Sequence, residues 1–427
     1  AEAAGRGVEV VLFPELSVTG YTCGDLFLQP ALLAAAEQAL AELLRRTAEL
    51  NTAFVVGLPV AVDDMLYNCA VVAAAGEVLG VVPKCHIPDY AEFYESRWFA
   101  SGQGRPTVEI ELCGQSVPFG PDLLFDIGGA RCAVEICEDL WVPAPPSTEM
   151  ALAGATVILN PSASDEIIGK ADYRRSLISN QSARLYCAYV YANAGEGEST
   201  TDLVFSGENL IAENGSIVAS TSLFSREMAV ADVDLEKLMA ERRRSNTWRA
   251  GEWCVSHLQT IDFSFTETGE GAPVACESVE DVPDWPTVLP TEDTGLLLNS
   301  ALDVLRPAPR TPFVPTDPAR RAACCEEILD LQAAGLKPRL AHTGTHSAVI
   351  GLSGGLDSTL ALLVTVRAFD MLGLPRTGVH AVSMPGFGTT GRTKSNAERL
   401  AEQLGVDFRT IAIGEAVRAH FTDIGHD

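Results

Sequence analysis

Residues 8–21 have the sequence VEVVLFPELSVTGY, in which a mainly apolar run leads into a glutamate. The run over residues 8–13 predicts a strand that is covered on both faces, and Glu15 follows its end. Residues 30–50 then show the apolar spacing of an amphipathic helix that begins at a proline. Residues 53–60 are apolar again. Strand, helix and strand in succession predict an α/β fold.

Two later strands also end next to a chemically reactive residue. The apolar run over 78–82 is followed by Lys84, and the run over 130–136 is followed by Cys137. Side chains at the ends of neighbouring strands converge on one edge of a sheet, where sites are commonly built. We therefore expect Glu15, Lys84 and Cys137 to lie together.

These three residue types suit one reaction. A thiolate is an effective nucleophile, and a nearby cation lowers the pKa of its thiol. A carboxylate can take the thiol proton and later activate water, while a lysine and the backbone N–H after the cysteine stabilise an oxyanion. The set predicts acyl transfer from an amide through a thioester. Taken singly, Cys137 is also typical of a buried apolar residue, Glu15 of a turn cap and Lys84 of a solvated strand edge.

Three segments around these residues resemble the nitrilase superfamily: FPELSVTGY, KCHIPDYAEFYESRWF and EICEDLWVP. The resemblance implies that Glu15 is the general base, Lys84 the oxyanion stabiliser and Cys137 the nucleophile. It also implies that Glu95 is a second glutamate that orients the lysine. The fold implied is a nitrilase-like α-β-β-α sandwich.

Two further segments, TGYTCGDLF and NAGEGESTTDLVFSGENLIAENG, resemble the members of that superfamily that hydrolyse glutamine. By this resemblance Tyr21, Tyr90, Glu138 and Ser164 are candidates to line a glutamine pocket. For Tyr90, a structural ring in the loop after Lys84 is the competing interpretation.

The amino-acid composition and the apolar periodicity of the chain change at about residue 263. Residues 263–316 are rich in Asp, Glu, Pro and Thr and have little periodicity, which predicts a linker. We accordingly divide the chain into domains at 1–262 and 317–427 on either side of it. The second domain shows an opening helix and then alternating strands and helices, which predicts a partial doubly wound parallel α/β sheet. These elements are expected at 317–334, 347–352, 358–372, 378–384, 393–404 and 407–413.

The loop Ser-Gly-Gly-Leu-Asp-Ser over 353–358 joins the first strand of that domain to its helix. Gly354 and Gly355 let the backbone approach a ligand, and the helix start offers unpaired N–H groups to a phosphate. Ser353 and Ser358 add hydroxyl donors. Asp357 is a candidate Mg²⁺ ligand, although a simple capped turn needs the same residue types.

The same hexamer resembles the loop with which N-type ATP pyrophosphatases bind the pyrophosphate part of ATP. The stretch VSMPGFGTTGRTKSNAERLAEQLGV further resembles the NAD synthetases, and this implies a nucleotide contact from Met384. IAIGEAVRAHFTDIGHD resembles their glutamine-dependent branch. The expected nucleotide substrate is ATP with Mg²⁺, and no tightly bound prosthetic group is expected.

The amino-acid composition limits which classes of partner this chain can bind. The 427 residues carry a formal net charge of −27, which repels nucleic acid and anionic lipid surfaces. The 11 cysteines form neither a zinc pattern nor a disulfide framework, as expected of a cytoplasmic protein. No apolar run of about 18 residues predicts a membrane span.

Together the resemblances imply a glutamine-hydrolysing NAD synthetase: an ATP-dependent ligase that amidates nicotinic acid adenine dinucleotide and forms homo-oligomers at full length. Both ends of the sequence look cut, so we expect this chain not to complete the synthesis alone. One alternative is a nitrilase-type amidase for another amide with a regulatory nucleotide-binding half. Others are a different amidotransferase of the same ATP family and a non-catalytic sensor of glutamine or ATP.

Overall fold

The computed structural model describes residues 1–195, 197–198, 203–248, 257–265, 305, 311, 313–385 and 391–426, with the side chains of 391–395 left aside. The chain divides into two compact units, residues 1–307 and 308–427. Most of the predicted linker lies outside the described residues, so our domain boundaries stay a prediction. No helix of the described chain is long and apolar enough to cross a membrane.

The first unit contains two sheets. The first has the strand order β1-β2-β3-β4-β6-β5, and the second has the order β12-β11-β10-β9-β8-β7-β13. The strands of the first sheet are β1 (Val10–Leu12), β2 (Ala53–Val62), β3 (Met65–Ala74), β4 (Glu77–Pro83), β5 (Val108–Leu112) and β6 (Gln115–Phe119). Those of the second are β7 (Leu123–Ile127), β8 (Ala130–Val134), β9 (Val157–Ser162), β10 (Ala188–Asn193), β11 (Leu210–Glu213), β12 (Ser216–Ser220) and β13 (Gln259–Phe263).

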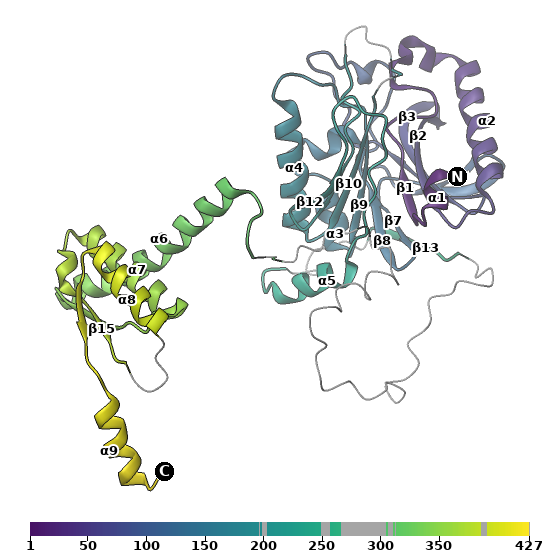
Figure 1. Cartoon of the computed structure of the whole chain (residues 1–427). Coiled ribbons are helices and arrows are strands. Elements are labelled where there is room, and N and C mark those ends of the chain that lie inside the picture. The colour runs from purple at the N-terminus through teal and green to yellow at the C-terminus, as the bar shows by residue number, and fades with distance from the viewer. Residues whose placement is uncertain are drawn as a thin grey trace. The chain divides into compact units, whose positions relative to one another are not determined.

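Helices cover the outer face of each sheet. Helix α2 (Pro30–Thr47) contacts the first sheet, and α3 (Ser147–Leu152) and α4 (Lys170–Leu185) contact the second, so the layers run α-β-β-α (Figure 1). The predicted sandwich is confirmed. Short helices α1 (Glu2–Gly5) and α5 (Leu235–Arg244) complete the unit.

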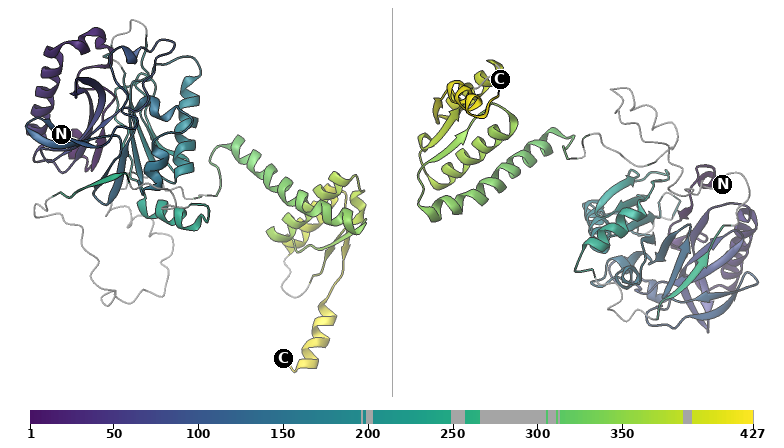
Figure 2. Two further views of the ribbon diagram at one scale, coloured as in Figure 1. Left: turned by 180° about the vertical axis from the view of Figure 1, so that it is seen from behind. Right: turned by 90° about the horizontal axis from the view of Figure 1, so that it is seen from below.

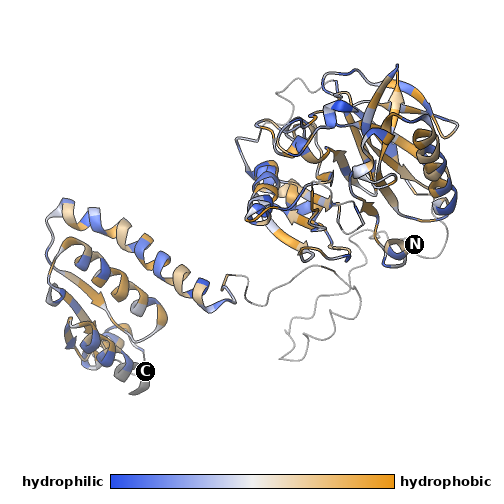
Figure 3. Ribbon diagram, turned by 90° about the horizontal axis from the view of Figure 1, so that it is seen from above, coloured by the Kyte–Doolittle hydropathy of each residue, from blue (hydrophilic) through white to orange (hydrophobic). Residues whose placement is uncertain are grey.

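Apolar side chains fill the spaces between the layers. Val55 and Val72 of the first sheet pack with Phe125 of the second in one buried cluster between the sheets. Leu40 of α2 packs on the first sheet, and Ile178 of α4 packs on the second. Each such side chain contributes about 1.5–3 kcal/mol when fully buried. Figure 3 shows this pattern as apolar strands with hydrophilic outer helix faces.

The second unit is a three-stranded parallel sheet with helices. Its strand order is β14-β15-β16, and both pairings are parallel. The elements are α6 (Pro318–Thr343), β14 (Ala348–Gly351), α7 (Leu356–Leu372), β15 (Val379–Ser383), α8 (Gly391–Leu404), β16 (Asp407–Thr410) and α9 (Gly414–Ile424). Helix α6 lies along α7 (Figure 2). It continues nine residues past its predicted end, through Pro338.

Candidate functional site

Glu15 and Lys84 come from one sheet and Cys137 from the other. Glu15 lies three residues past β1, Lys84 directly follows β4, and Cys137 opens a 3₁₀ helix (Cys137–Leu140) shortly after β8. The expectation that they stand at neighbouring strand ends of one sheet is wrong, because β2 and β3 separate β1 from β4. Face-to-face packing of the two sheets brings the residues together instead.

A glycine on β2 allows the Glu15 segment to reach its place. A Cβ atom on Gly57 would lie 2.1 Å from the backbone nitrogen of Leu16, so the two backbones cross in close contact. The Val18 N–H donates to the Gly57 carbonyl at 2.9 Å, and the Gly57 N–H donates to the Ser17 hydroxyl at 3.1 Å. The absence of a side chain at Gly57 therefore helps to fix the position of Glu15.

Lys84 is shared between two carboxylates. Its Nζ lies 2.7 Å from Glu15 Oε1 and 2.7 Å from Glu95 Oε1, and all three side chains are buried. Burial lowers the pKa of Lys84, but the charges of Glu15 and Glu95 outweigh this effect and hold that pKa well above its usual value. Burial raises the pKa of Glu95 to about 7 although Lys84 lowers it. The lysine is thus a fixed cation.

Three neutral groups complete the cluster. Asn68 Nδ2 donates to Glu15 Oε1 at 2.6 Å, and the Ala163 N–H donates to Glu15 Oε2 at 2.8 Å. The Tyr21 hydroxyl donates to Glu95 Oε1 at 2.8 Å. Asn68 lies mid-strand in β3 without a motif, so nothing in the sequence predicts its role. Tyr21, which is predicted to line a substrate pocket, contacts Glu95 instead.

The Cys137 thiol is electrostatically coupled to this cluster, and the residue as a whole is 6% exposed. Burial and then the charge of Glu15 raise the pKa of Cys137 well above its usual value, while Lys84 lowers it. The expected net lowering by a cation is therefore overturned by burial. A neutral resting thiol requires a base at the moment of attack, and this is a role that Glu15 can fill.

The turn at Cys137 presents one free amide. Cys137 has φ +46°, a conformation that non-glycine residues seldom adopt. Its own N–H donates to Asn160 Oδ1 at 3.1 Å. Among the hydrogen bonds of the described residues, none uses the N–H of Glu138. That amide is available, beside Lys84, to bind an oxyanion.

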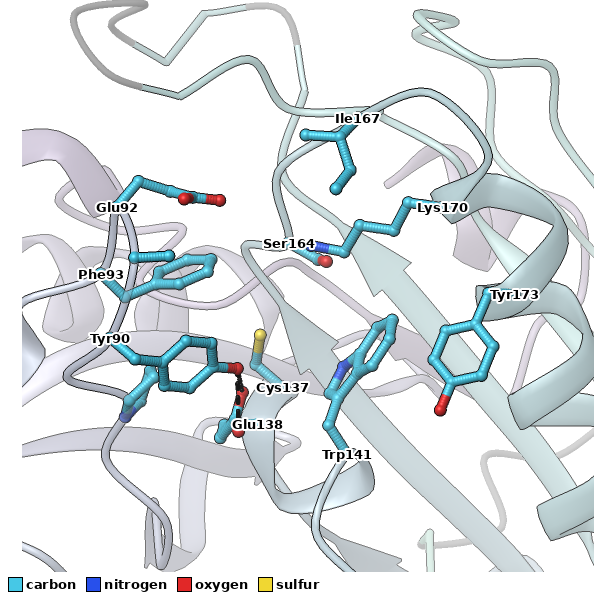
Figure 4. A pocket seen from close by; sticks show the side chains of 12 residues that line it. Tyr90, Glu92, Phe93, Cys137, Glu138, Trp141, Ser164, Ile167, Lys170 and Tyr173 are labelled. Atoms are coloured by element: carbon cyan, nitrogen blue, oxygen red, sulfur yellow. Dashed lines mark hydrogen bonds between the residues drawn. The ribbon is translucent and has the colours of Figure 1, made fainter.

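The sulfur faces a pocket of about 440 Å³, a size typical of small-molecule sites. In Figure 4 the Tyr90 hydroxyl points at Glu138, and Cys137 lies at the base between the aromatic side chains. Tyr90 donates to Glu138 Oε2 at 2.9 Å. The lining residues are Pro88, Tyr90, Ala91, Glu92, Phe93, Cys137, Glu138, Trp141, Ser164, Ile167, Lys170 and Tyr173.

Tyr90, Glu138 and Ser164 are thus in the pocket lining, and Tyr21 is not. Lys170, which is not among the predicted site residues, also lines the pocket. It forms an ion pair with Asp165, and its Nζ lies 5.3 Å from the ring centroid of Trp141. Lys170 is the first residue of a helix and stands in no motif that could have singled it out.

A third buried carboxylate, Asp139, ties two loops of the site together. Asp139 accepts the Ile136 N–H at 2.9 Å in the cysteine turn. It also accepts the His86 N–H at 2.7 Å in the segment after Lys84, and it lies 2.8 Å from His86 Nδ1. Asp139 therefore fixes the segment after Lys84 relative to the turn that carries Cys137.

The glycine loop of the second unit joins β14 to α7. Gly354 has φ +82°, which favours glycine. The Ser353 and Ser358 hydroxyls lie 3.1 Å apart, and the Gly355 N–H donates to Ser353 Oγ at 3.3 Å. Asp357 lies in the first turn of α7 and is exposed, with the helix N–H groups nearby.

Met384 directly follows β15 and is 51% exposed. A Cβ atom on Gly351 would lie 3.4 Å from its Cε atom, so Met384 is adjacent to the end of β14. Residues 386–390, which continue its predicted loop, lie outside the described residues. No cluster of three or more potential metal ligands occurs in the part of the chain that the structure describes.

Comparisons with known proteins match both units. Residues 328–427 are similar to the NAD synthase family. A glutamine-dependent NAD(+) synthetase of Mycobacterium tuberculosis is 44% identical over 426 residues, covering 98% of this chain and 59% of that protein. Those of Mycobacterium leprae and Aquifex aeolicus are 42% and 28% identical, covering 98% and 97% of this chain and 58% and 61% of those proteins.

The chain therefore spans about three fifths of the length of these relatives. The carbon-nitrogen hydrolase family matches residues 1–243, more than half of the chain and the whole of the Glu15, Lys84 and Cys137 cluster. On that match the chain belongs to the carbon-nitrogen hydrolase family.

Proposed function

We propose that the first unit hydrolyses the side-chain amide of glutamine. Cys137 Sγ attacks the amide carbon while Glu15 takes the thiol proton, and the oxyanion is received by Lys84 and the Glu138 N–H. The proton passes to the leaving nitrogen, ammonia departs, and a glutamyl thioester remains. Glu15 then activates water, which releases glutamate and restores the thiol. Glu95 holds the lysine in place.

One observation carries this proposal: a buried thiol coupled to a carboxylate and a cation opens on a small-molecule pocket. Glutamine is favoured as the amide because charged groups surround the thiol. Tyr90, Glu138, Ser164 and Lys170 offer donors and acceptors for an amino acid, and Glu138 and Lys170 can neutralise its ammonium and carboxylate groups.

We propose that the second unit binds ATP with Mg²⁺ as a substrate. Ser353, Gly354, Gly355 and Ser358 would surround its phosphates, and Met384 would contact the nucleotide. Asp357 fits one ligand position of a hard cation. With ammonia from the first unit, the complete protein would amidate nicotinic acid adenine dinucleotide through an adenylate, giving NAD, AMP and pyrophosphate. The named relatives, glutamine-dependent NAD(+) synthetases, support this activity.

The same proposal includes expectations about the cellular compartment, the oligomeric state and whether this chain makes NAD by itself. The nine cysteines of the described residues are free, which supports a reducing compartment, the cytoplasm. Homo-oligomer formation stays a prediction. Because the chain spans 59% of the Mycobacterium tuberculosis relative, we also expect this 427-residue chain not to make NAD alone.

Ammonia release tests the first step directly. The chain should convert glutamine to glutamate and ammonia, the Cys137→Ser variant should not, and Cys69→Ser, which alters a buried thiol of β3, should keep the activity. Asparagine and simple aliphatic amides serve as competing substrates. Faster turnover of an aliphatic amide than of glutamine would favour a general amidase and contradict the glutaminase assignment.

A further inference from the structure

A buried chain of hydrogen bonds connects Glu135 to the backbone of the nucleophile. The Tyr189 hydroxyl donates to Glu135 Oε1 at 2.5 Å, and Asn160 Nδ2 donates to the Tyr189 oxygen at 2.9 Å. The Cys137 N–H then donates to Asn160 Oδ1 at 3.1 Å. Glu135, Tyr189 and Asn160 are each at most 1% exposed. None of them lines the pocket, so the proposed reaction has not yet used them.

The direction of each hydrogen bond in this chain is fixed by its neighbour. In its ionised form Glu135 accepts at both oxygens, since Oε2 also receives the Ser147 N–H at 2.8 Å. The single proton of Tyr189 is committed to Glu135, so its oxygen must accept from the Asn160 amide group. That leaves Asn160 Oδ1 facing Cys137, where the Ser162 hydroxyl also donates to it at 2.6 Å.

Reversing the chain would disturb the nucleophile. If Glu135 carried a proton toward Tyr189, the tyrosine hydroxyl would have to donate to Asn160, and the asparagine amide would turn. Its NH₂ group would then face the Cys137 N–H, and a buried unpaired donor is costly. The turn at Cys137 already has an unfavourable φ of +46° and depends on such contacts to persist.

We propose that Glu135 is a positioning residue for the nucleophile, acting through Tyr189 and Asn160 on the backbone amide of Cys137. The relay fixes the turn that carries the sulfur, and it keeps the neighbouring Glu138 N–H directed at the oxyanion. This inference rests on the proposed function, because it assigns the relay to the attack of Cys137 on an amide. The competing explanation is that Glu135 only caps α3 through Ser147.

Kinetics of the 427-residue chain separate these explanations. Glu135→Gln and Tyr189→Phe should each lower kcat for ammonia release about 10- to 100-fold, with KM for glutamine within about twofold. Rates are measured at pH 8. Each rate is divided by the concentration of active enzyme, which is the amount of Cys137 that a diazoketone analogue of glutamine has alkylated when that reaction is complete. The double variant should be no slower than the slower single variant, because both changes break one chain.

Matched controls change other buried polar groups that are not members of the relay. Glu213→Gln changes a buried glutamate that accepts the Asp234 N–H at 2.9 Å. Tyr67→Phe removes a buried hydroxyl that accepts from Arg105 at 2.8 Å. Both should keep kcat within about twofold of wild type, whatever they do to stability.

A spectroscopic measurement follows the relay without turnover. In protein labelled with ¹⁵N-cysteine, the Cys137 amide resonance, assigned by its loss in Cys137→Ser, should move in Glu135→Gln and Tyr189→Phe but not in the controls. Unchanged kcat, or an unmoved resonance, in both relay variants would overturn the inference. If wild type released no ammonia while the resonance moved, the glutaminase proposal would fail and the relay would stand.

Discussion

Lys84 Nζ lies 2.7 Å from Glu15 Oε1, and both side chains have no exposed surface. Such a pair is worth little as a stabilising contact, since desolvation of two charges offsets much of their attraction. Its value is positional: Lys84 holds the carboxylate proposed as the base and is itself held by Glu95 at 2.7 Å.

Removing the cation should therefore be severe. Lys84→Met leaves two buried carboxylates without a counter-charge, and we expect a loss of about 3–5 kcal/mol in the free energy of unfolding, together with loss of ammonia release. Urea denaturation measures the first effect. Arg45→Met is the control, because Arg45 and its partner Glu42 are both exposed, and its loss should cost less than about 1 kcal/mol. Equal losses in the two variants would contradict the prediction.

Glu135 should make stability depend on pH. Burial raises the pKa of Glu135 to about 7 from 4.5, so the folded chain binds a proton in this range that the unfolded chain does not. Its contribution is complete below about pH 4.5 and is lost as pH rises through 7, by on the order of 3 kcal/mol. Between pH 4.5 and 8, wild type should therefore lose more stability than Glu135→Gln, as measured by urea denaturation. The exposed Glu77→Gln should follow wild type, and parallel curves for wild type and Glu135→Gln would refute the assignment.

The Tyr90 hydroxyl should act on binding. It donates to Glu138 Oε2 at 2.9 Å at the pocket wall, and its loss removes one hydrogen bond that orients a pocket-facing carboxylate. We expect Tyr90→Phe to raise KM for glutamine about fivefold, the equivalent of about 1 kcal/mol, with kcat within about twofold. Tyr186→Phe, on the far end of α4, should change neither. A fall in kcat at constant KM would instead place Tyr90 in the chemical step.

Much of the fold was predictable because an apolar run indicates a strand, and a reactive or turn-forming residue after the run indicates where that strand ends. The dipeptide Asn214-Gly215 is a strong turn signal and predicts a hairpin over residues 209–220. The structure has this hairpin between β11 and β12, with Asn214 and Gly215 at positive φ. Strands β5, β6, β7 and β13 were missed. In β5 exposed and buried positions alternate over only five residues, and β13 is mostly exposed, so neither carries a strong periodic signal.

The three catalytic candidates and Glu95 were predictable from the sequence, but the neutral supports and Lys170 were not. Glu15, Lys84 and Cys137 each follow a recognisable strand. Asn68 and Asn160 contact them from mid-strand positions, where one polar residue in an apolar run resembles ordinary variation. Their roles depend on pairing across and between sheets, and local sequence does not encode that pairing.

Gly57 offers a test of how closely the Glu15 segment is constrained. A Cβ atom there would meet the Leu16 nitrogen at 2.1 Å, so Gly57→Ala must push the two backbones apart. We expect ammonia release to fall at least tenfold, with KM little changed, as Glu15 moves away from the sulfur. Gly5→Ala, where nothing lies within 4 Å, is the control. Wild-type turnover in Gly57→Ala would show that the exact position of Glu15 is unimportant.

The glycine loop of the second unit allows a similarly matched comparison. Gly354 in the loop and Gly373 at the end of α7 have φ +82° and +66°, so alanine at either position costs about 1 kcal/mol in backbone strain. If the loop holds the phosphates of ATP, only Gly354→Ala also places a methyl group against the ligand. Calorimetric titration with Mg–ATP should then show at least tenfold weaker binding for Gly354→Ala and near wild-type binding for Gly373→Ala. Equal weakening would mean that the loss reflects domain stability, and the loop would no longer be the phosphate site.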